Sequence, residues 1–176
     1  MLRSGSYGQG ESGTAVKNTA ARLVARGAHE GVLAMRNVNR QQRIARSVIA
    51  ILAGAIVGIV LSLSTDIALH LSGFFPPLGE AAPDGALMAA TAYRTAYGVL
   101  GSYITARLAP GRPMQHALVL GGLGMAVSLL GAVATWNRGP AFGPHWYPVS
   151  LIVLAIPSAW LGGWLRVRQS QAKASA

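Results

Sequence analysis

The chain of 176 residues contains no cysteine, which excludes disulfide bonds, thiolate metal sites and cysteine nucleophiles. Charged residues are also scarce, at 11%, whereas soluble domains carry about 25%. Hydrophobic residues make up 52% of the chain, and the mean hydropathy is +0.40. An ordinary water-facing surface cannot be built from this supply of charge. The composition therefore indicates a chain that is embedded in lipid.

Acidic residues are the scarcest charged class, with five Asp and Glu against fifteen Lys and Arg. The basic residues flank apolar runs and form no stripe interleaved with aromatic residues, so we expect no nucleic-acid binding. Paired carboxylates, a Ser/His/Asp set and an H-E-x-x-H pattern are all missing. His70 and His145 alone fall short of a metal signature. The sequence therefore predicts no enzyme activity, no cofactor and no metal.

Four apolar segments predict an all-α fold, a four-helix transmembrane bundle within residues 41–170. The expected spans cover about residues 47–71, 86–108, 116–136 and 146–165. A spanning helix needs about 20 apolar residues, so three segments qualify directly. The second qualifies if Arg94 can be accommodated. Short connections predict antiparallel neighbours.

Residues 1–40 are polar, rich in Gly and Ser, and basic. Their low hydrophobicity favours a flexible, disordered tail. The alternative is a weak amphipathic helix over Thr14 to Leu33, which Gly27 and Gly31 would each weaken by about 1 kcal/mol. The cations of this tail could lie against anionic lipid, at about 1 kcal/mol each.

The basic residues are distributed unequally between the two ends of the predicted spans. Eight precede the first span, two lie between the second and third, and three follow the fourth. The connection over 72–85 has none, but it holds Glu80 and Asp84, and the third connection has only Arg138. By the positive-inside rule both termini are cytoplasmic. An even number of spans is then required, and four fits.

Two opposite charges, Asp66 and Arg94, fall inside the predicted spans. A charge at mid-bilayer costs at least about 2.5–3.5 kcal/mol and usually finds a partner in the protein. In an antiparallel hairpin of the first two spans, both residues lie toward the outer side, and the long arginine stem can bridge a difference in depth. The sequence therefore predicts an Asp66–Arg94 ion pair.

This ion pair implies a register for the first two spans. If Asp66 faces Arg94, the numbers of facing residues sum to 160. Steps of one helical turn then pair small residues only: Ser62 with Gly98, Gly58 with Ser102, and Gly54 with Ala106. Small residues four apart let membrane helices approach closely. Ser158 and Gly162 offer a second face of this kind in the fourth span.

The ion pair has a functional and a structural interpretation. In the functional one, it forms with Tyr93, Tyr97 and His70 a polar cluster open to the outer face, which binds an anion or relays protons. In the structural one, it neutralises two charges and fixes the helix register. We favour the structural interpretation, because one acid cancels one base and a proton relay would normally show a surplus carboxylate.

Three segments, "AYRTAYGVLGSYITARLAP", "RPMQHALVLGGLG" and "PSAWLGGWL", resemble small four-span bacterial inner-membrane proteins over about residues 40–168. The resemblance implies a bacterial inner membrane but no activity or substrate. We therefore expect a non-enzymatic structural or accessory membrane protein. Its partners would be the lipid bilayer and either a second copy or another membrane protein. The alternative is a small oligomeric transporter or channel subunit that uses Asp66 and Arg94.

Overall fold

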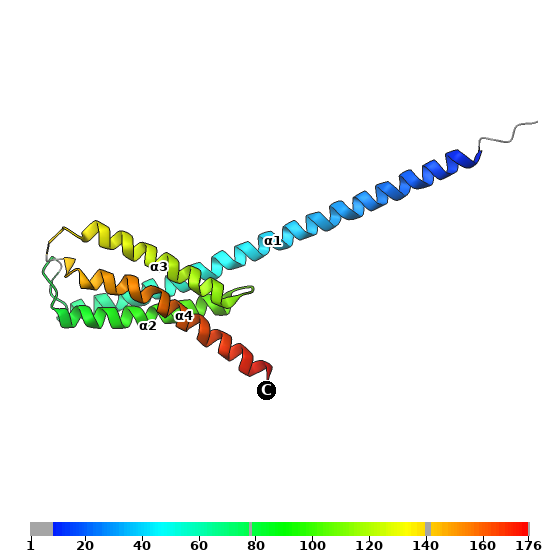
Figure 1. The fold of residues 1–176 in the computed structure, drawn as a ribbon. Helices are drawn as coiled ribbons and strands as arrows, with labels where there is room; N and C mark the ends of the chain where they lie inside the picture. The colour runs from blue at the N-terminus through cyan, green and yellow to red at the C-terminus, as the bar shows by residue number, and fades with distance from the viewer. Residues whose placement is uncertain (1–8, 78, 140–141, 176) are drawn as a thin grey trace, which may run out of the picture. The chain divides into compact units, whose positions relative to one another are not determined.

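The computed structural model describes residues 9–77, 79–139 and 142–175, and this described part is helical with no strands. Its four helices are α1 (Gln9–Leu71), α2 (Asp84–Leu108), α3 (Pro113–Thr135) and α4 (Trp146–Ala174), as Figure 1 shows. The chain divides into two compact units, residues 1–44 and residues 45–176. The first unit contains the N-terminal part of α1, and the second contains the rest of α1 with the other three helices.

In the first unit, helix α1 begins at Gln9, within the segment for which the sequence predicts a disordered tail. The first proline of the chain is Pro76, so no ring interrupts the helix. An ion pair one helical turn apart, Arg26 Nε to Glu30 Oε1 at 3.3 Å, adds a small stabilisation. Local helix propensity therefore outweighs the low hydrophobicity that predicted disorder.

In the second unit, consecutive helices run antiparallel, as predicted. Figure 1 shows the α1–α2 and α3–α4 connections at one end, and the α2–α3 connection with the C-terminus at the other. At the first end, Trp146 Nε1 donates a hydrogen bond of 3.1 Å to Asp84 Oδ1. At the second end, Tyr103 Oη donates one of 2.6 Å to Gln169 Oε1. Helices α2 and α4 therefore run parallel to each other.

Three stretches of helix are long and apolar enough to cross a membrane: Met35–Leu71, Pro113–Thr135 and Trp146–Ala174. They bear out the prediction of a membrane protein at this coarser level. Helix α2 is not among them, because its 25 residues include Arg94 and several hydroxyl groups. Helix α4 continues past the predicted end of its span at 165, since no proline or glycine follows Gly163.

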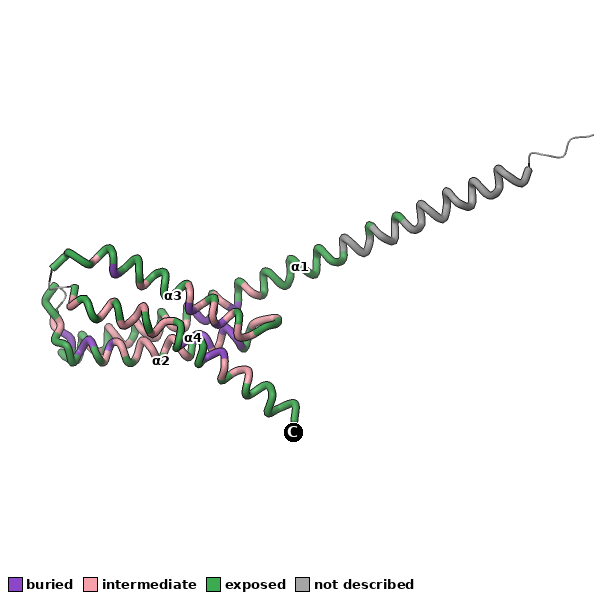
Figure 2. Tube along the Cα trace, viewed as in Figure 1, coloured by how far each residue is buried: buried purple, intermediate pink, exposed green. Residues whose placement is uncertain are grey.

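Burial in the second unit follows residue size, as Figure 2 shows along the chain trace. The buried apolar side chains are mostly alanines, among them Ala50, Ala117 and Ala159. Large apolar side chains lie outside, and Val127 and Leu130 are 69% and 70% exposed. Small residues between helices with large apolar residues outside are typical of membrane bundles, where lipid covers the outer face.

Helices α1 and α2 touch at glycines, but not in the predicted register. A Cβ added to Gly54 would collide with Gly101 O and Thr105 Oγ1, and a Cβ on Gly101 would lie 3.4 Å from Gly54 C. The predicted partner of Gly54 was Ala106. The α2 residues that face α1, Gly101 and Thr105, each lie one position before the expected residues, Ser102 and Ala106. One position corresponds to a rotation of about 100° around the axis of α2.

The predicted stripe of α2 packs against α4 instead. A Cβ added to Gly98 would lie 3.1 Å from Ser158 Oγ. One added to Gly162 would lie 2.9 Å from Ser102 Cβ and 2.8 Å from Tyr103 N. The pairings of Gly98 with Ser62 and of Ser102 with Gly58 are therefore wrong. Helix α2 carries two adjacent stripes of small residues. The rule that the numbers of facing residues sum to 160 cannot tell which of these stripes faces α1.

Candidate functional site

The structure brings Asp66 of α1 and Arg94 of α2 together. Arg94 Nη2 lies 2.7 Å from Asp66 Oδ2, at the distance of a charge-assisted hydrogen bond. The side chains are 35% exposed for Arg94 and 23% exposed for Asp66. Both side chains are therefore partly buried, and each neutralises the charge of the other.

Two tyrosines complete the site, which we call the Asp66–Arg94 cluster (Asp66, Tyr93, Arg94 and Tyr147). Tyr93 Oη donates a hydrogen bond to Asp66 Oδ1, so both carboxylate oxygens are engaged. The Tyr147 ring centroid lies 6.0 Å from Arg94 Cζ, within the range of a cation–π interaction. The cluster therefore joins α1, α2 and α4.

A small apolar core holds the aromatic side chains of the cluster in place. Phe75, Ala86 and Ala90 are buried together, and Tyr93 and Tyr147 pack against them. Phe75 belongs to the connection after α1, whereas the two alanines begin α2. This packing fixes both rings next to Arg94. Among the described residues, Arg94 Nε is the one buried side-chain nitrogen or oxygen with no hydrogen-bond partner.

Of the other residues predicted for the cluster, Tyr97 lies beside it and His70 faces elsewhere. The ring of Tyr97 is 5.8 Å from that of Tyr93, and its hydroxyl lies 2.9 Å from Thr65 Oγ1. His70 Nδ1 lies 2.8 Å from the backbone oxygen of Asp66, not from the carboxylate. Its ring stacks on Phe75 at 5.2 Å.

Tyr147 is a member of the cluster that the sequence did not predict. The available signal was topological, since the start of the fourth span and Arg94 both lie toward the outer side. Distance along the chain gives no sign of it, because 53 residues separate Arg94 from Tyr147.

A groove of about 510 Å³ borders the ion pair and is lined by residues of all four helices. Five of the predicted helix-packing residues line it: Gly54, Gly58, Ser62, Gly98 and Ser102. The sixth, Ala106, is buried. The lining is mostly apolar, and its charged residues are Asp66 and Arg94. The groove therefore has room beside a neutralised pair of charges.

The described ranges hold no group of three or more His, Cys, Asp and Glu residues that could hold a metal ion. His145 Nε2 lies 2.9 Å from Trp136 O, and its ring stacks on Trp136 at 4.2 Å. His116 Nε2 lies 2.9 Å from Ser47 Oγ and so links α3 to α1. His116 and His145 therefore make contacts that tie segments of the chain together.

No family model, curated protein or solved structure matches this chain. What the Asp66–Arg94 cluster can do therefore follows from its geometry. An aspartate whose two carboxylate oxygens accept hydrogen bonds from an arginine and a tyrosine ties together the elements that carry these residues. Such a group stabilises an interface between helices.

Proposed function

We propose that this protein is a non-enzymatic structural or accessory membrane protein, in which the Asp66–Arg94 cluster ties three helices together. The observation that carries the proposal is that both oxygens of the Asp66 carboxylate are occupied, one by Arg94 and one by Tyr93. The charge of each residue is therefore neutralised inside the protein. The Asp66 carboxylate has no oxygen without a partner.

We further propose that α2 is a fourth span and that both termini are cytoplasmic. At 1.5 Å per residue its 25 residues extend about 37 Å, more than the roughly 30 Å hydrocarbon core. Two of its hydroxyl groups are satisfied within the helix, since Thr91 and Thr95 donate to carbonyl oxygens one turn earlier at 3.0 and 2.7 Å. The basic residues assign the orientation by the positive-inside rule, and the family resemblance points to a bacterial inner membrane.

The accessory role rests on the side of α3 that borders the groove, where Gly124 and Val127 line it. A Cβ added to Gly124, or to Gly131 two turns further on the same side, would meet no described atom within 4 Å. Large apolar side chains such as Val127 flank these glycines and are exposed. Glycines on an exposed apolar helix allow a second helix to approach closely. We propose that a second copy or another membrane protein packs here.

Charge-neutralising substitutions test the structural role of the cluster. Asp66→Asn and Arg94→Gln alone each leave one unpaired charge in the bundle, which costs on the order of 2.5–3.5 kcal/mol. Each single variant should lose folded protein in the membrane. The double variant should recover much of it. Arg138→Gln, an exposed cation outside the bundle core, is the control and should match the wild type. A double variant no more abundant than the singles would contradict the proposal.

The second candidate function is a small oligomeric transporter or channel subunit, and the groove beside the ion pair favours it. The groove reaches from Ile51 to Asp66 along α1 and is open, so a solute could contact Arg94. In that case the double variant would fold as well as the wild type but lose transport in reconstituted vesicles. A double variant that folds and shows the same transport in vesicles as the wild type would favour the accessory role.

A further inference from the structure

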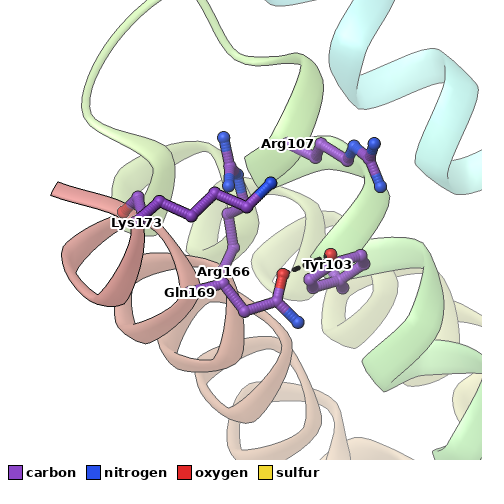
Figure 3. A pocket seen from close by; sticks show the side chains of 6 residues that line it. Tyr103, Arg107, Arg166, Gln169 and Lys173 are labelled. Carbon is purple, nitrogen blue, oxygen red and sulfur yellow. Dashed lines mark hydrogen bonds between the residues drawn. The ribbon is translucent and has the colours of Figure 1, made fainter. Parts of the chain in front are cut away.

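A second cavity, of about 300 Å³, lies between the C-terminal parts of α2 and α4. We call it the basic pocket, and its lining residues are Tyr103, Arg107, Arg166, Gln169, Ser170 and Lys173. Figure 3 shows the side chains of Arg166 and Lys173 on α4 and that of Arg107 across the pocket on α2. Three cations thus line one small cavity.

No side-chain carboxylate of the second unit can neutralise the basic pocket. Its acids are Asp66, Glu80 and Asp84. Asp66 is paired with Arg94, which lies 13 residues before Arg107 on α2, about 20 Å along the helix axis. Asp84 begins α2, and Glu80 precedes it, at the end of the unit opposite to Arg107. The like charges of the pocket therefore repel one another, and no side-chain carboxylate among the described residues of the second unit offsets them.

Neutral polar groups accompany these cations. Tyr103 Oη donates a hydrogen bond of 2.6 Å to Gln169 Oε1, which Figure 3 marks with a dashed line. This bond engages the amide oxygen of Gln169 and leaves its Nε2 as the donor end of the side chain. The Ser170 hydroxyl lines the pocket and donates to Val167 O at 2.7 Å. The positive charge of the three cations is therefore the main feature that the pocket offers to a ligand.

Stabilisation of the helix ends accounts for only part of the arrangement. Arg107 and Lys173 lie in the last turns of α2 and α4, where cations offset the negative end of the helix dipole. That effect falls off within one turn. Arg166 lies eight residues before the end of α4 and is half-buried. Its position calls for another explanation.

We propose that the basic pocket binds a phosphate group, carried by an anionic lipid headgroup or by a free phosphate ion. Guanidinium groups match phosphate oxygens in geometry, and an ammonium adds a point charge. Basic pockets between membrane helices on the cytoplasmic side are suited to lipid headgroups. The pocket lies at the end that the proposed topology places in the cytoplasm. Binding to purified protein in detergent tests it independently of that topology.

The test uses full-length protein in a nonionic detergent. Native mass spectrometry compares retention of dioleoyl-phosphatidylglycerol with that of dioleoyl-phosphatidylcholine, and calorimetry measures binding of inorganic phosphate. The pocket variant is Arg107→Gln with Arg166→Gln. The control, Arg112→Asn with Arg168→Gln, removes two cations that do not line the pocket. Arg168 lies over the Trp164 ring at 4.4 Å, and Arg112 has a φ of 47°, which asparagine tolerates.

We expect the wild type to retain phosphatidylglycerol in preference to phosphatidylcholine. The pocket variant should bind phosphatidylglycerol about tenfold more weakly than the wild type, and the control less than about twofold more weakly. The reason is that only the pocket variant removes guanidinium groups that line the pocket. Competition by inorganic phosphate would identify the phosphate group itself as the ligand. Lipid binding without such competition would identify the whole headgroup. Either result would support the proposal that the basic pocket binds a phosphate group.

Two results would overturn the proposal. One is no preference for phosphatidylglycerol together with no phosphate binding in the wild type. The other is equal loss in the pocket variant and the control, which would mean attraction by the basic surface as a whole. Circular dichroism checks that the variants fold. If the double pocket variant does not, Lys173→Gln against Arg168→Gln repeats the comparison at exposed residues near the end of α4.

Discussion

The hydroxyl of Thr105 on α2 lies in the space where Gly54 on α1 lacks a side chain. Thr105 is fully buried, and its Oγ1 donates a hydrogen bond of 3.1 Å to the carbonyl oxygen of Ala50. A Cβ added to Gly54 would collide with this hydroxyl. The two helices are therefore held together by direct contact between a buried polar group and backbone, which requires glycine at position 54.

Gly54→Ala should destabilise the protein. Overpacking costs typically 1–3 kcal/mol, and this exceeds the gain of about 1 kcal/mol in helix propensity. Gly122→Ala is the matched control, since a Cβ there would meet no described atom within 4 Å. It should be neutral or stabilising. The measurement is the midpoint of unfolding by SDS in mixed micelles, and equal midpoints for the two variants would contradict the prediction.

The interface between α2 and α4 makes a second, graded prediction. A Cβ at Gly162 would meet the backbone of α2, with Tyr103 N at 2.8 Å. A Cβ at Gly163, which faces α3, would meet Met114 Sδ at 2.9 Å, on a flexible side chain, and Ala117 Cβ at 3.0 Å. Gly162→Ala should therefore lower the free energy of unfolding more than Gly163→Ala, by about 1–2 kcal/mol. The opposite order would show that α2 and α4 separate easily.

The tyrosines around the ion pair should differ in their contribution to stability. Tyr93→Phe removes a hydrogen bond to a carboxylate, worth about 1.5–3 kcal/mol. Tyr97→Phe removes only a bond between two hydroxyls, Tyr97 Oη and Thr65 Oγ1, worth about 0.5–1.5 kcal/mol. The free energy of unfolding should fall more for the first. Equal losses would mean that Asp66 does not depend on Tyr93.

The absence of native cysteine permits a direct test of topology with a membrane-impermeant maleimide. Exposed positions in the connections and in the C-terminal part of α4 are available. Glu80→Cys and Asn137→Cys should react in intact cells. Gly111→Cys and Gln171→Cys should react only after permeabilisation. Labelling of Gly111→Cys in intact cells would mean that α2 does not cross the membrane.

The pairing of Asp66 with Arg94 could be predicted because they were the one acid and the one arginine away from the ends of the predicted spans. Charge inside a membrane requires neutralisation, and the antiparallel order of the helices fixed the depth of both residues. Tyr147 could not be found in this way. Its contact with Arg94 depends on α4 lying beside α2, and nothing in the local sequence specifies that neighbour.

In the N-terminal part of α1, the structure has a helix where the sequence favoured a disordered tail and kept a helix over Thr14 to Leu33 as the alternative. Composition measures how much apolar surface a segment can bury, so a polar and basic segment predicts disorder. Helix formation depends on backbone hydrogen bonds within the segment, and these require no core. A run of 75 residues without proline before Pro76 was the signal that favoured continuity.

The sequence by itself determined that the chain is helical and apolar enough for a membrane, because both properties follow from the composition of each segment. It also determined which two charges must meet. Only the tertiary structure decided which stripe of α2 faces α1 and which faces α4, since two stripes of small residues lie about 100° apart and pack equally well in principle. The same choice brings Arg107 and Arg166, 59 residues apart, to one pocket. The rotation of a helix about its axis is set by its neighbours, and no single segment encodes it.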